Sequence, residues 1–169
     1  MPVQKGRLMQ RAIAMLLVLA AMGFGTASAM VFGVGPMLGE PMGLTAQVFP
    51  GVGIALVAGV GYSWWQDTST QLQGDLIFTG RNLTSNRHEE GAMAVYMGLG
   101  AQARFSGDPN SPTVRSGLRM PLGIIYMFPG NPALGLYVEA DPRFNLGTDQ
   151  YFSCDAVCGL RIYWGRVGG

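Results

Sequence analysis

The sequence predicts an all-β protein, an eight-stranded antiparallel up-and-down β-barrel that crosses a membrane. Three observations favour this fold class. The chain is 49% hydrophobic and only 12% charged, yet beyond residue 29 it has no run of the ~18 apolar residues that a spanning helix needs. Its apolar residues instead recur at alternate positions, as in strands with lipid on one face and a lumen on the other. Its 26 glycines suit a narrow lumen, where side chains are crowded.

The clearest strand covers residues 91–105, because its two sets of alternate residues differ in character. The even positions are small or polar, including Gln102 and Arg104. A helix would spread both sets around its surface, and the glycines would weaken it. The odd positions are all apolar and predict a lipid-facing stripe: Met93, Val95, Met97, Leu99, Ala101, Ala103 and Phe105.

The same alternation predicts seven further strands, which makes eight in all, an even number. Proline, glycine and polar residues mark the connections between them, including a turn at GEPMG, a break at residues 64–68, a loop over residues 106–116 and a turn at PGNPA. The first two strands are shorter than the roughly 9–11 residues that a spanning strand needs. The seven predicted strands are residues 31–38, 44–49, 52–63, 71–79, 118–128, 134–141 and 152–164.

The chain begins with the pattern of a secretory signal peptide over residues 1–29. A charged head with Lys5, Arg7 and Arg11 precedes an apolar run over residues 12–24, and Ala27 and Ala29 provide the A-x-A spacing of a cleavage site. Residues 30–169 are then expected to form a single barrel domain of 140 residues. Without the three basic residues of the head, eight arginines face ten acidic residues, and this balance argues against a nucleic-acid partner.

Aromatic residues gather near the predicted strand ends and indicate two girdles at the membrane interfaces. With the amino terminus in the periplasm, we expect the outer girdle to contain Trp64, Trp65, Phe105, Tyr151 and Phe152, and the inner girdle Phe49, Phe128, Tyr163 and Trp164. The alternative is that aromatics simply end strands, as in any sheet. The girdles favour the outer membrane of a Gram-negative-type bacterium, where eight strands is a usual barrel size.

Six charged residues are predicted to face the lumen, as a network of ion pairs that fills it. Buried charges must pair or lose several kcal/mol each to desolvation. We therefore expect the three arginines to pair with the three carboxylates. The alternative function is a ligand or proton pathway, although a barrel of eight strands has little room for a pore. The six residues are Asp75, Arg104, Arg119, Glu139, Asp155 and Arg161.

Four segments resemble a family of small glycine-rich bacterial proteins that are predicted outer-membrane β-barrels. They are GVGPMLGEPMGL (33–44), LRMPLGIIYMF (118–128), LGLYVEADPRF (134–144) and GLRIYW (159–164). The family has no assigned activity and is also represented among spirochaete outer surface proteins. The resemblance covers most of the predicted mature chain, implies an eight-stranded barrel and implies no catalytic residue.

One polar segment raises the question of catalysis. Ser85, His88, Glu89 and Glu90 lie close together in the sequence, and a Ser/His/Glu set is similar to that of the eight-stranded outer-membrane lipid A deacylases. Catalysis requires a nucleophile and a base that a third group orients. Because these residues fall in a predicted periplasmic loop, we expect a solvated polar turn instead.

Cys154 and Cys158 are expected to form no disulfide with each other. In a strand, residues i and i+4 are about 13 Å apart at roughly 3.3 Å per residue, whereas a disulfide requires Cα atoms closer than about 7 Å. Both thiols should face lipid, and a metal site is not expected for the same reason. The alternative is a tight loop closed by its own disulfide, which would leave seven strands.

The predicted function is that of an outer-membrane barrel of structural or surface-interaction type, porin-like in fold but without catalysis, cofactor or metal. Its expected partners are outer-membrane lipid and the barrel-insertion machinery, and we expect a monomer. Two alternatives stay open: a lipid-modifying outer-membrane enzyme, and a soluble periplasmic barrel that binds an apolar ligand with its two faces inverted.

Overall fold

The computed structural model describes residues 31–64, 68–82, 91–106, 113–130, 132–146 and 152–165. The predicted signal peptide and the candidates Ser85, His88, Glu89 and Glu90 lie outside these residues. The described residues form nine β-strands: β1 (Val31–Gly39), β2 (Met42–Gly51), β3 (Ile54–Ser63), β4 (Ser69–Asn82), β5 (Ala92–Ser106), β6 (Thr113–Arg119), β7 (Leu122–Phe128), β8 (Ala133–Leu146) and β9 (Phe152–Trp164). In the same residues, no helix is long and apolar enough to cross a membrane.

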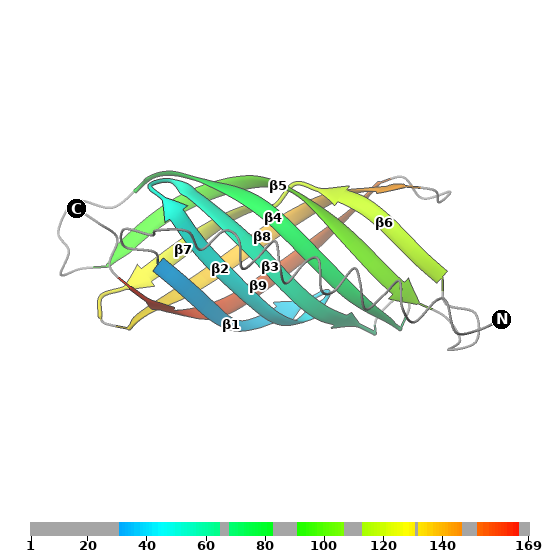
Figure 1. Ribbon diagram of the computed structural model, residues 1–169, viewed down its shortest axis with the longest axis horizontal. Helices are drawn as coiled ribbons and strands as arrows, with labels where there is room; N and C mark the ends of the chain where they lie inside the picture. Colours follow the sequence, from blue (N-terminus) through cyan, green and yellow to red (C-terminus); the bar gives the residue numbers. More distant parts are fainter. Residues whose placement is uncertain are drawn as a thin grey trace.

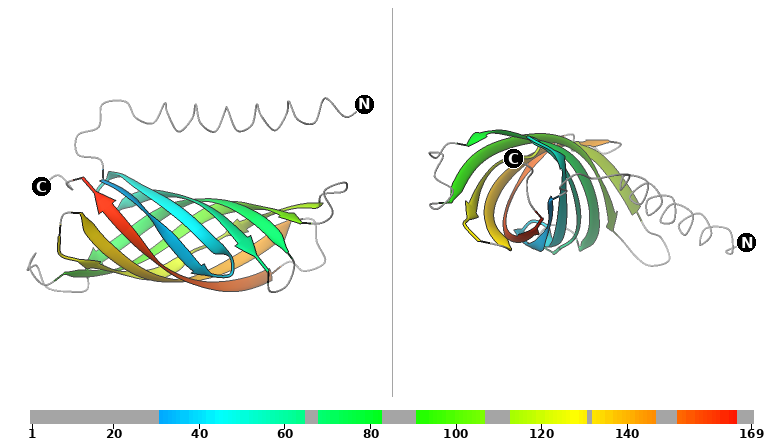
Figure 2. Two further views of the ribbon diagram at one scale, coloured as in Figure 1. Left: turned by 90° about the horizontal axis from the view of Figure 1, so that it is seen from below. Right: turned by 60° about the vertical axis from the view of Figure 1, so that its left-hand side comes forward.

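The strands form a closed antiparallel barrel (Figures 1 and 2). From β1 to β5 and from β8 to β9 each strand pairs with the next one in the sequence, and the ring closes where β1 pairs with β9, for example at Phe32 opposite Trp164. Strands β6 and β7 both lie between β5 and β8. They therefore occupy one position in the ring, and nine strands fill eight positions. The prediction of an all-β antiparallel barrel with eight positions in its ring is confirmed.

The break between β6 and β7 falls at Met120 and Pro121, within the predicted strand 118–128. Proline has no N–H to donate to a neighbouring strand. The two residues at the break are nevertheless hydrogen-bonded to both neighbouring strands. Gly98 N of β5 donates to Pro121 O at 2.8 Å, and Met120 N donates to Pro142 O of β8 at 2.9 Å. The predicted loop 106–116 is wrong at both ends, since Ser106 belongs to β5 and β6 begins at Thr113.

Four other predicted strands are too short. Strands β1 and β2 have 9 and 10 residues, and the turn between them is confined to Glu40 and Pro41. Strand β4 runs from Ser69 to Asn82. Strand β8 continues to Leu146, five residues past its predicted end, because the alternation of inward and outward residues continues.

The predicted facing of alternate residues is confirmed in β3–β9. Large apolar side chains point outward and are exposed, such as Leu99 (64%) and Val138 (60%). Residues of opposite parity point into the lumen. At the end where β1 begins and β9 ends, which we call the terminal end, an apolar cluster fills the lumen: Val31, Ala55, Val57, Ile77, Ala94, Tyr96, Ile125, Tyr137 and Tyr163.

Two aromatic belts lie on the outside of the barrel. Trp64, Phe105 and Phe152 are exposed at the end opposite the terminal end, and Phe128 and Trp164 are exposed at the terminal end. The predicted girdle is wrong for two members: Tyr163 is buried in the lumen, and Phe49 packs against the lumen cluster with its ring centroid 6.0 Å from that of Tyr163. Both have the inward parity of their strands. Trp65 and Tyr151 lie outside the described residues.

Candidate functional site

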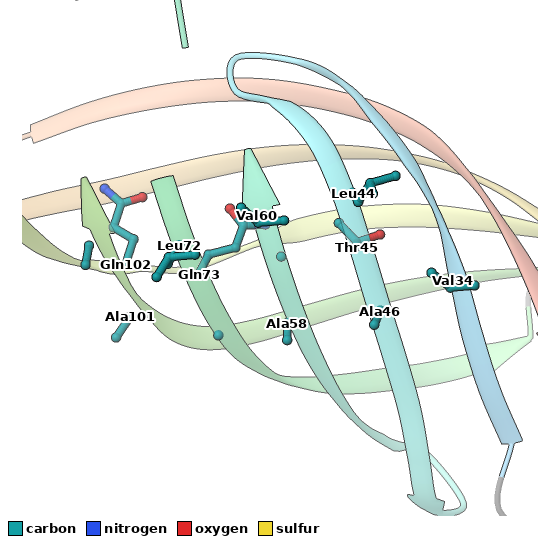
Figure 3. Close-up of a pocket in the computed structure, with 13 residues that line it drawn as sticks. Val34, Leu44, Thr45, Ala46, Ala58, Val60, Leu72, Gln73, Ala101 and Gln102 are labelled. Carbon is teal, nitrogen blue, oxygen red and sulfur yellow. The ribbon is translucent and has the colours of Figure 1, made fainter. Parts of the chain in front are cut away.

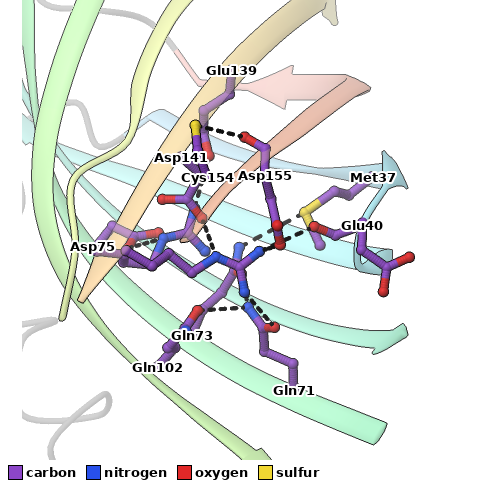
Figure 4. Close-up of polar contacts among 12 residues, drawn as sticks. Met37, Glu40, Gln71, Gln73, Asp75, Gln102, Glu139, Asp141, Cys154 and Asp155 are labelled. Carbon is purple, nitrogen blue, oxygen red and sulfur yellow. Dashed lines mark hydrogen bonds and ion pairs between the residues drawn. The ribbon is translucent and has the colours of Figure 1, made fainter. Parts of the chain in front are cut away.

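Charged and amide side chains fill the lumen between the apolar cluster and the end opposite the terminal end. We call this set the lumen charge network (Figure 4). Each member occupies an inward position of its strand, so the alternation that places apolar residues outside also places these residues inside. Its members are Gln71, Gln73, Asp75, Gln102, Arg104, Arg119, Glu139, Asp141, Arg143 and Asp155.

Arg119 is the centre of the network, because three carboxylates converge on its guanidinium. Its Nε lies 3.1 Å from Asp75 Oδ1, and its Nη2 lies 2.8 Å from Glu139 Oε1 and 3.1 Å from Asp141 Oδ2. The residue is 2% exposed. Gly100, on the neighbouring strand, leaves room for this arrangement, since a Cβ there would collide with the Asp75 carboxylate.

Arg143 links the network to the turn between β1 and β2. Its Nε lies 3.5 Å from Asp141 Oδ2, and its Nη2 pairs with Asp155. The same Nη2 donates to the Glu40 carbonyl at 3.3 Å. Because Arg143 is 1% exposed, these contacts replace the water that its charge would otherwise bind.

Three glutamines extend the network across the lumen. Gln71 Nε2 donates to Gln73 Oε1 and to Gln102 Oε1, both at 3.1 Å. Gln71 Oε1 accepts from Arg143 Nη1 at 3.4 Å and from Arg104 Nη2 at 3.2 Å. Arg104 Nη2 also lies 3.9 Å from Asp155 Oδ2. Strands β4, β5, β8 and β9 are thereby joined through the interior as well as through their edges.

Arg161 lies apart from this network, near the apolar cluster, and its contacts within the described residues are with uncharged groups. Its Nε donates to Thr45 Oγ1 at 2.9 Å and its Nη1 to Gln47 Oε1 at 3.0 Å. Its guanidinium carbon lies 3.9 Å from the centre of the Tyr137 ring, in a cation–π arrangement. The predicted pairing of Arg161 with a carboxylate is therefore replaced by amide, hydroxyl and aromatic contacts.

The structure places all six predicted lumen residues inside and brings five of them into one network. Sequence reasoning missed Asp141 and Arg143, because it ended the strand at residue 141 and treated Asp141 as a strand end. Continued alternation past that point, with Phe144 and Leu146 apolar and outward, was the signal that could have found Arg143. Thr45 and Gln47, the partners of Arg161, also have inward parity. Because they are uncharged, the search for lumen charges did not select them.

Two further predictions concern the outer face. The segment that contains Cys154 and Cys158 is part of β9, and both are exposed free thiols on its outward face, so the alternative of a tight disulfide loop is wrong. The alternative of a barrel with inverted faces is wrong for the described strands, because the buried interior residues include Arg, Asp, Glu and Gln while Leu, Val and Phe are exposed.

Fold and lumen together define a small closed β-barrel with a polar, filled interior and an apolar exterior. Comparisons with protein-family models and with curated protein sequences find no match. A comparison with solved structures matches the crystal structure of the N-terminal β-barrel domain of Pseudomonas aeruginosa OprF with a TM-score of 0.56 and 14% sequence identity. The match covers 80% of this chain and 97% of that chain. At this identity the likeness shows the barrel fold.

Proposed function

We propose that the protein is an outer-membrane β-barrel whose filled lumen makes it a structural or surface-interaction protein and not a channel. The observation that carries this proposal is the sorting of charge between the two faces. Among charged residues whose side chains the structure describes, Arg115 alone is exposed, near one end of β6. The others are buried or half-buried. An exterior of this kind suits hydrocarbon, because charged side chains at the bilayer midplane cost about 2–4 kcal/mol.

The distance between the aromatic belts supports a spanning orientation. Phe152 and Trp164 mark the two ends of β9 and lie twelve residues apart on the same exposed face. At roughly 3.3 Å per residue this separation is about 40 Å along the strand, or about 28 Å along the barrel axis for a strand tilt near 45°. The apolar band of outer-membrane barrels is about 25 Å tall.

The filling of the lumen supports a closed barrel. In a barrel of eight strands the interior is just wide enough for side chains, and here the fully buried side chains include some of the largest available: Arg119, Arg143, Tyr137, Met37 and Gln71. The apolar cluster at the terminal end adds a dry layer. Water and ions would have to displace paired charges to pass.

The proposal also covers the export, the location, the family and the partners of the protein. The sequence pattern of residues 1–29 supports export, and export supports a Gram-negative-type outer membrane. The glycine-rich segments support kinship with the small outer-membrane family that is also represented among spirochaetes. Outer-membrane lipid and the barrel-insertion machinery follow as partners. We propose no catalytic role, and analysis of lipid A and phospholipids from cells with and without the protein tests that part.

Planar-bilayer recording tests the closed lumen. The purified mature barrel, added to a phospholipid bilayer, should give no discrete current steps over a range of applied voltages. A matched variant, Arg119→Ala with Arg143→Ala, removes the two largest buried side chains and should conduct more often if it still folds. Regular unitary steps from the unmodified barrel would contradict a filled lumen.

A further inference from the structure

An apolar groove crosses the outside of β1–β5, on the face opposite to the lumen charge network. Its floor is a row of residues that are paired from strand to strand: Val34 with Ala46, Ala46 with Ala58, Ala58 with Gly74, and Gly74 with Ala101. The groove has a volume of about 670 Å³. Figure 3 shows Ala101 and Gln102 on opposite sides of β5, so the small residues face outward.

Larger side chains form a ridge on each side of this floor. One ridge is Leu44, Val60 and Leu72, which are neighbours on β2, β3 and β4 and line the groove. The second row, two residues further along each strand, is Leu56, Leu76 and Leu99 on β3, β4 and β5. All six of these side chains are well exposed. On β3 and β4 the small residues therefore lie between two rows of large ones, and on β5 the first row continues with the smaller Ala103.

Gly74, the fourth of the five floor residues, is a glycine that no contact within the described barrel requires. A Cβ added at Gly74 would meet no atom within 4 Å, whereas one added at Gly100, on the neighbouring strand, would approach the Gly74 carbonyl to 2.5 Å. Gly74 also has no left-handed backbone conformation to satisfy. A glycine inside a strand weakens it, and at Gly74 the space that a side chain would fill is left open as part of the groove.

The dimensions of the groove suit a hydrocarbon chain. Four strand spacings of about 4.8 Å give a length of roughly 19 Å, and the two ridges are four residues apart, which is about 13 Å between Cα atoms before side chains narrow the gap. The nine outward residues that line the groove are aliphatic or glycine, and the other four lining residues, Thr45, Gly59, Gln73 and Gln102, have inward parity. A single acyl chain in this channel contacts protein on three sides and gains dispersion energy that it would lose over a void.

A second copy of the barrel fits less well. The groove covers roughly 19 by 13 Å, or about 250 Å², whereas a stable protein interface buries about 800 Å² on each partner. Two concave faces related by a two-fold axis would also leave a gap between them. The size and shape of the groove therefore favour the thinner occupant.

We propose that this groove is a binding site for one acyl chain of a membrane phospholipid, which it holds more tightly than the lipid that surrounds the rest of the barrel. The inference rests on the proposed function, because the groove meets lipid only if the barrel spans a membrane. The chemistry of the ligand is that of a saturated or monounsaturated hydrocarbon chain, and the headgroup is not recognised by the groove.

Photolabelling tests the site. The mature barrel is reconstituted into phosphatidylcholine vesicles that contain a small fraction of phosphatidylcholine with a diazirine near the methyl end of one chain. After irradiation, mass spectrometry should find several-fold more label on peptides from β2–β5 than on peptides from β7–β9. The variant Gly74→Leu fills the groove and should lower this label several-fold, and Ala58→Leu is a second variant with the same expected effect. Ala140→Leu, also outward and exposed, is the matched control and should leave the label unchanged.

The outcomes separate this site from the proposed function. Flotation of the vesicles reports whether the barrel is integrated, and heat-dependent migration on gels reports whether each variant is folded. A barrel that does not float overturns both proposals. An integrated barrel that is labelled equally on both faces, or whose label is unchanged in the folded Gly74→Leu and Ala58→Leu variants, overturns the groove alone. If the unmodified barrel forms cross-linked dimers and these two variants do not, the groove binds a second copy of the chain. That result would overturn the proposal of an acyl-chain site.

Discussion

At the scale of the residue, Arg119 decides how the interior is organised. Three carboxylates contact its guanidinium, and all three belong to residues that are less than a tenth exposed. Taking such charges out of water is costly, and their mutual attraction offsets the cost only while each has a partner. Arg119 is therefore the residue whose loss leaves the largest uncompensated charge.

We expect Arg119→Met to destabilise the barrel by about 3–5 kcal/mol, because it leaves buried carboxylates unpaired. Adding Asp75→Asn should recover part of this loss, so the double variant should cost less than the sum of the single variants. Urea titration of the barrel in phospholipid vesicles, followed by tryptophan fluorescence, measures both. The control is Arg115→Met, which removes the same charge at an exposed position and should cost clearly less than Arg119→Met, because no buried charge is left behind. Strict additivity of the two lumen substitutions would show that Arg119 and Asp75 do not interact.

At the scale of the element, alternation predicted which face of each strand is inside, because lipid and lumen impose opposite demands on neighbouring residues. It did not predict where strands end. Strand β8 continues five residues past its predicted end, and the 118–128 strand breaks at Pro121, where one donor is missing. Ends and breaks depend on hydrogen-bonding partners in other strands. Arg143 was missed because the predicted strand ended at residue 141, although alternation continues beyond it. The uncharged partners of Arg161, Thr45 and Gln47, lie on a strand far away in the sequence, so no local pattern indicates them.

If the outward face of β5 contacts lipid, the stability lost on introducing arginine should depend on how deep the residue lies in the bilayer. Leu99 is exposed near the middle of its strand, so Leu99→Arg should destabilise by about 2–4 kcal/mol, whereas the same change at Leu146, the last residue of β8, should cost about 0–1 kcal/mol. Urea titration in vesicles compares the two. Equal costs at both positions would mean that Leu99 does not face hydrocarbon.

The strand conformation of β9 predicts that Cys154 and Cys158 stay reduced and separate in an oxidising compartment. Their Cα atoms are about 13 Å apart at the usual rise per residue, beyond the reach of a disulfide. Intact-mass measurement of the unfolded, unreduced protein after alkylation should find two added alkyl groups. A mass with none added would require a disulfide and a loop in place of the strand.

At the scale of the whole molecule, closure of the barrel depends on one seam, between β1 and β9. Their pairing runs from Phe32 opposite Trp164 to Gly39 opposite Val157 and is interrupted around Pro36, which has no N–H. The strands approach closely at this point, since a Cβ at Gly35 would collide with the Leu160 carbonyl. The sequence predicted an even ring but not this register, because the seam joins the two ends of the chain.

The polar interior and apolar exterior of the whole barrel lead to one central claim, that the protein resides in an outer membrane with its strands across the bilayer. Density-gradient separation of membranes from bacteria that express the full chain tests this claim most directly. The account predicts that the protein sediments with the outer membrane, lacks residues 1–29 by intact mass, and migrates on gels as a compact form that heating converts to an unfolded one. Recovery of the folded protein in the soluble periplasmic fraction, or with the inner membrane, would contradict it.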